Sequence, residues 1–189
     1  MTLQHTRAAS EEFPKTVTLE DGTTLSVRIL QPSDEDALLA FFQGIPEQER
    51  YWLREDVSDP AVIHQWVSEI DYHRVLPLIA SRDEAIVADA TLHRRGYGAR
   101  HSLGEIRLVV APLFRGRGLG YALLAELTEI AQRAGLDRLE AEIVSGAQDA
   151  ALEAIELIGF EQVAVLPGHL RDRDGNRHDL LLLVYVLQE

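Results

Sequence analysis

The sequence contains no cysteine, a single methionine and few aromatic residues, which make up 6% of its 189 positions. Without cysteine the protein has no disulfide bond, no thiolate nucleophile and no zinc site built on cysteine. No apolar run approaches the length of about 18 residues that a membrane-spanning helix needs. The first residues, MTLQHTRAASEEFPKT, also lack the apolar core of a signal peptide. We therefore expect a soluble cytoplasmic protein with no membrane partner.

Positive charge is also scarce, because 18 lysines and arginines face 31 aspartates and glutamates and leave a net charge of −13. A field of this sign repels polyanions, so nucleic acid is not an expected partner, whereas a cationic substrate is attracted. Hydrophobic residues make up 46% of the chain, which is enough for one core. We expect a single domain over residues 1–189, with residues 1–15 as a mobile N-terminal segment. Whether the protein forms a homodimer is left open.

Apolar periodicity predicts an alternation of strands and helices. A period of two on both sides of Asp21 and Gly22 predicts an N-terminal hairpin. Further strands are predicted at 75–80, 85–93, 104–110, 138–144, 161–166 and 178–187, and helices at 33–45, 59–70, 118–134 and 147–158. Ser33 and Asp59 are the predicted N-caps of the first two helices. This order indicates an α/β fold with a mixed sheet and helices on both faces.

The stretch RGRGLG, residues 115–120, lies between a predicted strand and the longest predicted helix. Bare backbone amides at a helix N-terminus form an anion site, and two arginines raise the local positive potential. A tight turn with solvated arginines is the alternative. A P-loop is excluded because no Gly-Lys-Ser/Thr follows, and a dinucleotide fingerprint would need glycine where Leu123 stands, although Glu140 lies at a suitable distance.

The segment VVAPLFRGRGLGYALLAELTEIA resembles motif A of the GNAT superfamily of N-acetyltransferases, with Arg115, Gly118 and Gly120 at matching positions. ELIGF, near residue 160, resembles the helix-to-strand turn that closes the family's fold, so the resemblance spans residues 24–187. The region from LEDGTTLSVRIL onward is similar to a bacterial subgroup that includes protein lysine acetyltransferases. The resemblance implies a GNAT-like, mostly antiparallel sheet flanked by helices on both faces, with an extra N-terminal hairpin strand.

The resemblance also implies the reaction, a transfer of acetyl from the co-substrate acetyl-CoA to a primary amine in a ternary complex. The implied site residues are Leu108, Val109 and Val110 along the pantetheine and acetyl group, and Arg115, Gly116, Arg117, Gly118, Leu119 and Gly120 around the phosphates. Larger side chains at Gly118 or Gly120 are expected to fill the pyrophosphate space. Gln148 stands where the family often has asparagine and is a further cofactor-binding candidate.

Amine attack on a thioester needs a neutral amine, and the departing thiolate gains from a proton. Glu105 lies where many family members carry the carboxylate base, and strand alternation places it on one face with Arg107, its alternative ion-pair partner. Ile155 occupies the position of the family's usual tyrosine acid. A non-catalytic acyl-CoA-binding or regulatory module is therefore the alternative function. Gln148 with Ser145 also fits a capping box.

The histidines and the remaining aromatic residues show no clear catalytic or metal-binding pattern. The seven histidines show neither an i, i+4 pair nor an HExxH pattern, so we expect no metal site. Tyr97 either lines the amine site or points to solvent from a hairpin loop. Trp52 and Trp66 are expected to pack helices onto the sheet.

Overall fold

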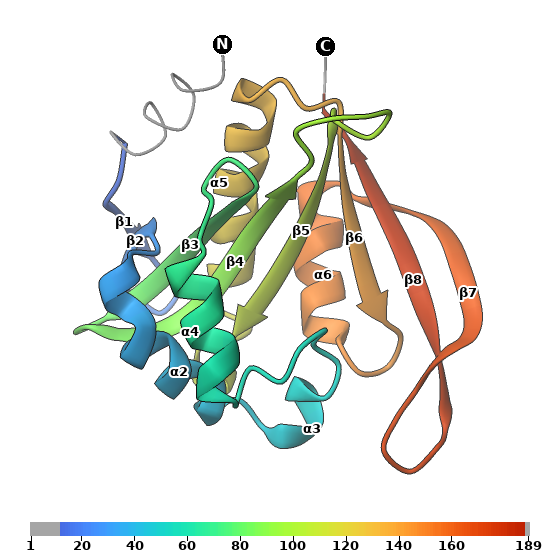
Figure 1. The fold of residues 1–189 in the computed structure, drawn as a ribbon, viewed down its shortest axis with the longest axis horizontal. Coiled ribbons are helices and arrows are strands. Elements are labelled where there is room, and N and C mark those ends of the chain that lie inside the picture. Colours follow the sequence, from blue (N-terminus) through green and yellow to red (C-terminus); the bar gives the residue numbers. More distant parts are fainter. Residues whose placement is uncertain (1–11, 188–189) are drawn as a thin grey trace.

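The computed structural model describes residues 12–187, which form one eight-stranded sheet with helices on both faces (Figure 1). The strands are β1 (Lys15–Thr18), β2 (Thr24–Ile29), β3 (Val75–Arg82), β4 (Ala85–Arg94), β5 (Leu103–Val110), β6 (Arg138–Val144), β7 (Glu161–Arg171) and β8 (Arg177–Val186). The helices are α2 (Glu35–Gly44), α3 (Glu47–Arg50), α4 (Pro60–Ser68), α5 (Leu119–Arg133) and α6 (Asp149–Ile158), with short 3₁₀ turns η1 (Pro32–Asp34) and η2 (Pro112–Phe114). None of these helices is long and apolar enough to cross a membrane.

The strands lie in the order β1-β2-β3-β4-β5-β6-β8-β7, and every neighbouring pair is antiparallel except β5 and β6. This confirms the predicted mixed, mostly antiparallel sheet and its N-terminal hairpin. The parallel pair is short, because only Leu103–Glu105 of β5 align with Arg138–Glu140 of β6. Beyond this point the two strands diverge, and a gap opens toward their C-terminal ends (Figure 1). The gap splits the middle of the sheet.

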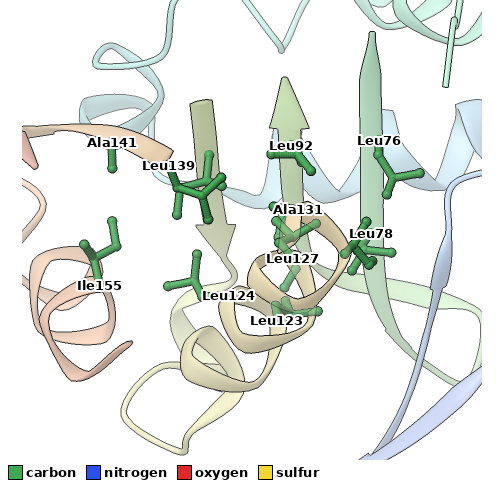
Figure 2. Packing of buried hydrophobic residues seen from close by; sticks show 14 of the residues in the cluster. Leu76, Leu78, Leu92, Leu123, Leu124, Leu127, Ala131, Leu139, Ala141 and Ile155 are labelled. Atoms are coloured by element: carbon green, nitrogen blue, oxygen red, sulfur yellow. The ribbon is translucent and has the colours of Figure 1, made fainter. Parts of the chain in front are cut away.

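Two apolar clusters cover the two faces of the sheet. Helices α5 and α6 pack on one face, where the α5 side chains of Leu123, Leu124, Leu127 and Ala131 are fully buried against strands β3, β4 and β6 (Figure 2). Helices α2 and α4 pack on the other face around Phe42 and Ile63. Each buried leucine contributes roughly 1.5–3 kcal/mol, so these helices hold the central strands firmly.

The N-terminal end of the described chain is part of the folded domain. Phe13 packs against the α5-side cluster, and Lys15, the first residue of β1, forms a 2.6 Å ion pair with Glu126 of α5. Residues 1–11 of the predicted mobile segment 1–15 lie outside the described residues. In residues 12–15, the apolar contact of Phe13 and the ion pair of Lys15 attach the chain to the domain.

Two helix boundaries test the cap predictions. Asp59 caps α4 as predicted, since its side chain accepts a 2.9 Å hydrogen bond from the amide of Ala61. The Ser33 prediction is wrong, because residues 32–34 form the turn η1 and α2 begins after Asp34. Asp34 is instead fixed by Arg28 of β2, with two contacts of 2.6 and 2.7 Å between the guanidinium and the carboxylate.

Candidate active site

The glycine-rich loop leads from η2 into the N-terminus of α5. Gly116 and Gly118 have φ angles of +63° and +83°, a left-handed conformation that side chains disfavour. Gly118 is the N-cap of α5, and its carbonyl accepts the hydrogen bond of the Ala122 amide at 3.0 Å. The amides of the three residues between them precede the first intrahelical hydrogen bond, so they can donate to a ligand. This geometry fits the anion site expected from the sequence.

The missing side chain of Gly120 serves the packing of the helix. A Cβ atom on Gly120 would lie 3.2 Å from Cδ2 of Leu108 and 3.3 Å from Cβ of Ala154. Its missing side chain therefore lets α5 pack closely on β5 and α6. A larger residue at Gly120 would push against the core rather than into the loop's open side.

Both arginines of the loop are paired with carboxylates that lie far away in the sequence. Arg115 forms a two-pronged ion pair with Glu49 of α3, at 2.5 and 3.2 Å, and its Nε donates to the carbonyl of Val110 at 2.8 Å. Arg117 pairs with Asp21 of the β1–β2 turn at 2.7 Å. The sequence predicted that these arginines raise the local positive potential, and in the fold each of them is opposed by a carboxylate. An anion bound here would share or displace these carboxylates.

Strand β5 has an open edge in its second half, next to the glycine-rich loop. Leu108 and Val110 pack against the α5-side cluster, whereas Val109 packs against the α2-side cluster, as the predicted alternation requires. After Glu105, no residue of β5 is aligned with a residue of β6. Backbone groups along this edge are available to an extended ligand, except the carbonyl of Val110, which accepts from Arg115.

Glu105 is the last β5 residue that pairs with β6, and it is partly buried. Its Oε1 lies 2.8 Å from Nε of Arg107 and 2.7 Å from Nη2 of Arg54. Burial raises the pKa of the Glu105 carboxyl, but the hydrogen bond from Arg107 and the charges of Arg107 and Arg54 outweigh it and lower the pKa below its usual value. The predicted contact with Arg107 is therefore present, and Glu105 is ionised at neutral pH.

His93 of β4 lies directly across from Glu105 in the β4–β5 register. Its Nε2 lies 3.0 Å from the hydroxyl of Thr91. Burial and the nearby positive charge of Arg107 lower the pKa of His93 to about 4. The imidazole is therefore neutral at pH 7 and adds no charge beside Glu105.

Helix α6 provides the remaining two candidates. Ile155 is 3% exposed and packs in the α5-side cluster with Ala141 and Leu139 (Figure 2), so this position serves the core. Gln148 is the N-cap of α6, and its Oε1 accepts a 2.8 Å hydrogen bond from the amide of Val144. The predicted capping box with Ser145 is wrong, because Gln148 bonds back to the end of β6 instead.

The aromatic candidates lie in different surroundings. Tyr97 is 95% exposed in the β4–β5 loop, so it points to solvent. Trp66 packs α4 into the α2-side cluster as expected, with its ring nearly perpendicular to that of Phe42. Trp52 lies after α3, with its ring 4.9 Å from that of His178 on β8.

Sequence reasoning missed three charged residues of the site. Glu49 lies in the short helix α3, which no periodicity indicates, Arg54 follows this helix, and Glu142 lies on β6. Nη2 of Arg54 is 2.9 Å from Oε2 of Glu142, so Arg54 bridges β5 and β6 across the gap. Only the folded chain brings these residues together, because Arg54 and Glu142 are 88 positions apart.

Comparison with known proteins agrees with this geometry. The model of the acetyltransferase (GNAT) family matches residues 36–160. The Bacillus subtilis (strain 168) protein named "Putative phosphinothricin acetyltransferase YwnH" is 26% identical over 164 residues, covering 84% of this chain and 97% of that protein. The GNAT domain of S. lividans PAT has the same fold, with a TM-score of 0.75 at 22% identity over 92% of this chain and 96% of that one. The structure of yncA from Salmonella typhimurium "with its cofactor Acetyl-CoA" has a TM-score of 0.73 at 20% identity over 87% of this chain and 95% of that one.

Proposed function

This chain belongs to the acetyltransferase (GNAT) family, and we propose that it transfers the acetyl group of acetyl-CoA to a primary amine. The observation that carries the proposal is the divergence of β5 from β6 after Glu105, immediately ahead of the glycine loop and the N-terminus of α5. An open strand edge beside an anion site suits a long molecule with amide groups at one end and phosphates at the other.

The residues present fit acetyl-CoA. The left-handed turns at Gly116 and Gly118 leave the first amides of α5 ready to donate to the pyrophosphate, and a Cβ at Gly116 would meet no atom within 4 Å. The open edge of Leu108, Val109 and Val110 would pair with the pantetheine amides. Arg115, Arg117, Leu119, Gly120 and Gln148 complete the proposed cofactor site. Arg115 and Arg117 would turn from Glu49 and Asp21 toward the phosphates.

Acetyl-CoA supplies a thioester, whose carbonyl carbon is an electrophile. In the proposed reaction the ammonium group of the acceptor first loses one proton and becomes a neutral amine. The amine nitrogen then bonds to this carbon, the carbon–sulfur bond breaks, and the nitrogen loses its second proton to water. Glu105 would accept the first proton. A carboxylate that is already ionised can act as this base at neutral pH.

No side chain at the usual acid position can protonate the leaving thiolate, since Ile155 is aliphatic and buried. We infer that water or a nearby hydroxyl supplies this proton. Positioning of the amine against the thioester then provides most of the rate enhancement, a contribution that reaches about 7–11 kcal/mol in well-oriented systems.

The acceptor is proposed to be cationic in solution, as a small amine or a protein lysine is. The net charge of −13 and the carboxylates of Glu105 and Glu142 at the gap attract such a molecule.

A thiol-release assay tests the proposed function. Purified protein is mixed with acetyl-CoA and, in turn, a diamine, free lysine methyl ester, a lysine-containing peptide and neutral hydroxylated analogues. We expect thiol release with at least one amine and none with the analogues. Acetyl-CoA binding without thiol release for any amine would favour the non-catalytic acyl-CoA-binding module, which the buried Ile155 makes the second candidate.

A further inference from the structure

Arg54 lies on the segment between α3 and α4, which crosses the gap between β5 and β6. A single nitrogen, Nη2, is 2.7 Å from Oε1 of Glu105 and 2.9 Å from Oε2 of Glu142. One oxygen of each carboxylate therefore contacts the same nitrogen atom. Nothing in the family chemistry described above assigns a role to Arg54 or Glu142.

Among the charged groups around this nitrogen, Arg54 is the cation that bridges the two carboxylates. Arg107 neighbours Glu105 on the same strand, neutral His93 faces it from β4, and Glu140 aligns with it on β6. The side chain of Arg54 is 49% exposed and that of Glu142 is 46% exposed, whereas that of Glu105 is 26% exposed. Partly exposed ion pairs contribute little stability, so a competing cation can displace Arg54.

Resting on the proposed function, we propose that Arg54 is a specificity-determining residue. Its guanidinium holds the place of the acceptor's ammonium group between Glu105 and Glu142, and a cationic acceptor displaces it. An ammonium nitrogen can make the same two contacts, because one nitrogen of Arg54 already makes both. Glu142 becomes the second acceptor-binding carboxylate of the site.

The exchange of cations has a chemical consequence. A guanidinium does not give up its proton in a protein, so Arg54 can keep Glu105 ionised but cannot react. An ammonium group in the same place can pass its proton to Glu105 and become the nucleophile. Arg54 therefore occupies the place between the two carboxylates until an amine arrives.

The experiment compares Arg54→Gln and Glu142→Gln with two matched controls. Arg173→Gln removes an arginine that pairs with Glu47 of α3, and Glu161→Gln removes an exposed carboxylate on the edge strand β7. Calorimetry measures binding of 1,4-diaminobutane and of the neutral 1,4-butanediol. We expect Arg54→Gln to bind the diamine about two- to fivefold more tightly, Glu142→Gln to bind it more weakly by a similar factor, and the controls to change neither affinity.

A second readout needs neither turnover nor the diamine. In a ¹³C carboxyl titration, Arg54→Gln should raise the pKa of Glu105, because it removes a cation at 2.7 Å, and Arg173→Gln should leave it unchanged. An unchanged Glu105 pKa in Arg54→Gln, equal diamine affinity in all five proteins, or no diamine binding at all would each overturn the inference. Thiol release by the parent protein decides the proposed function separately.

Discussion

Asp89 carries a carboxyl group that is largely buried and has no hydrogen-bond partner among the described residues. It lies on β4 between Ile79 of β3 and Val109 of β5, on the face that the α2-side cluster covers. Asp89 as a whole residue is 8% exposed. Within residues 12–187 no hydrogen bond or ion pair reaches its carboxyl group. Burial alone raises the pKa of Asp89 from 3.8 to about 7.

The raised pKa makes the protein less stable as the pH rises. Between pH 3.8 and about 7 the folded protein keeps the Asp89 proton while the unfolded chain has lost it. The free energy of unfolding then falls by about 1.4 kcal/mol per pH unit, and the loss ends above the folded pKa. Over this window the total cost of ionising Asp89 is at most about 4 kcal/mol.

Asp89→Asn isolates this cost, because asparagine has nearly the same shape and does not titrate. Urea unfolding of both proteins at pH 4.5, 5.5, 6.5 and 8 gives the difference in unfolding free energy at each pH. We expect the difference to shift in favour of Asp89→Asn by several kcal/mol from pH 4.5 to pH 8, with equal m-values. A constant difference across this range would show that Asp89 is solvated or paired in solution, and the reasoning would fail.

Four further outcomes are expected. Gly118→Val should weaken acetyl-CoA binding by about tenfold or more in calorimetry, whereas Gly135→Val, with the similar φ of +75° at the other end of α5, should destabilise the fold but leave affinity intact; equal affinity in the Gly118 variant would move the phosphate site elsewhere. Glu105→Gln should lower the rate by about 10²–10⁴-fold at neutral pH and less at high pH, where the amine is already neutral; an unchanged neutral rate would exclude Glu105 as the base. The pKa of His93 should be about 4 by NMR titration, because burial and Arg107 lower it, and a midpoint near 6.5 would contradict its buried position. The kcat/KM for the cationic acceptor should fall as ionic strength rises, and a value indifferent to salt would refute electrostatic attraction.

Local signals in the sequence predicted most of the fold. The apolar spacing of α5, the cap at Asp59 and the glycines ahead of α5 act within a few residues of one another, so their patterns are readable without the fold. Strand alternation also placed Glu105 and Arg107 on one face. These features depend on backbone geometry that neighbouring residues determine.

The charge pairs of the site could not be predicted in this way. Arg115 meets Glu49 across 66 positions, and Arg54 meets Glu142 across 88, because the fold brings α3 and its following segment over the gap. The prediction that Ser33 caps α2 failed for the same reason. Ser33 and Asp34 are both suitable cap residues, and the choice depends on Arg28, which reaches Asp34 from β2.

The short pairing of β5 with β6 also divides the sheet into two parts. Strands β1–β5 form one plate and β6, β8 and β7 form another, and only three residue pairs, ending at Glu105 and Glu140, join them edge to edge. Val110 lies five residues beyond this joint, about 16 Å along the strand. A rotation of about 5° between the plates would widen the gap at Val110 by about 1.4 Å over that length. Glu105 lies at this joint, so a wider gap would leave its carboxylate in place, while the α5 side chains that pack against both parts of the sheet oppose the rotation.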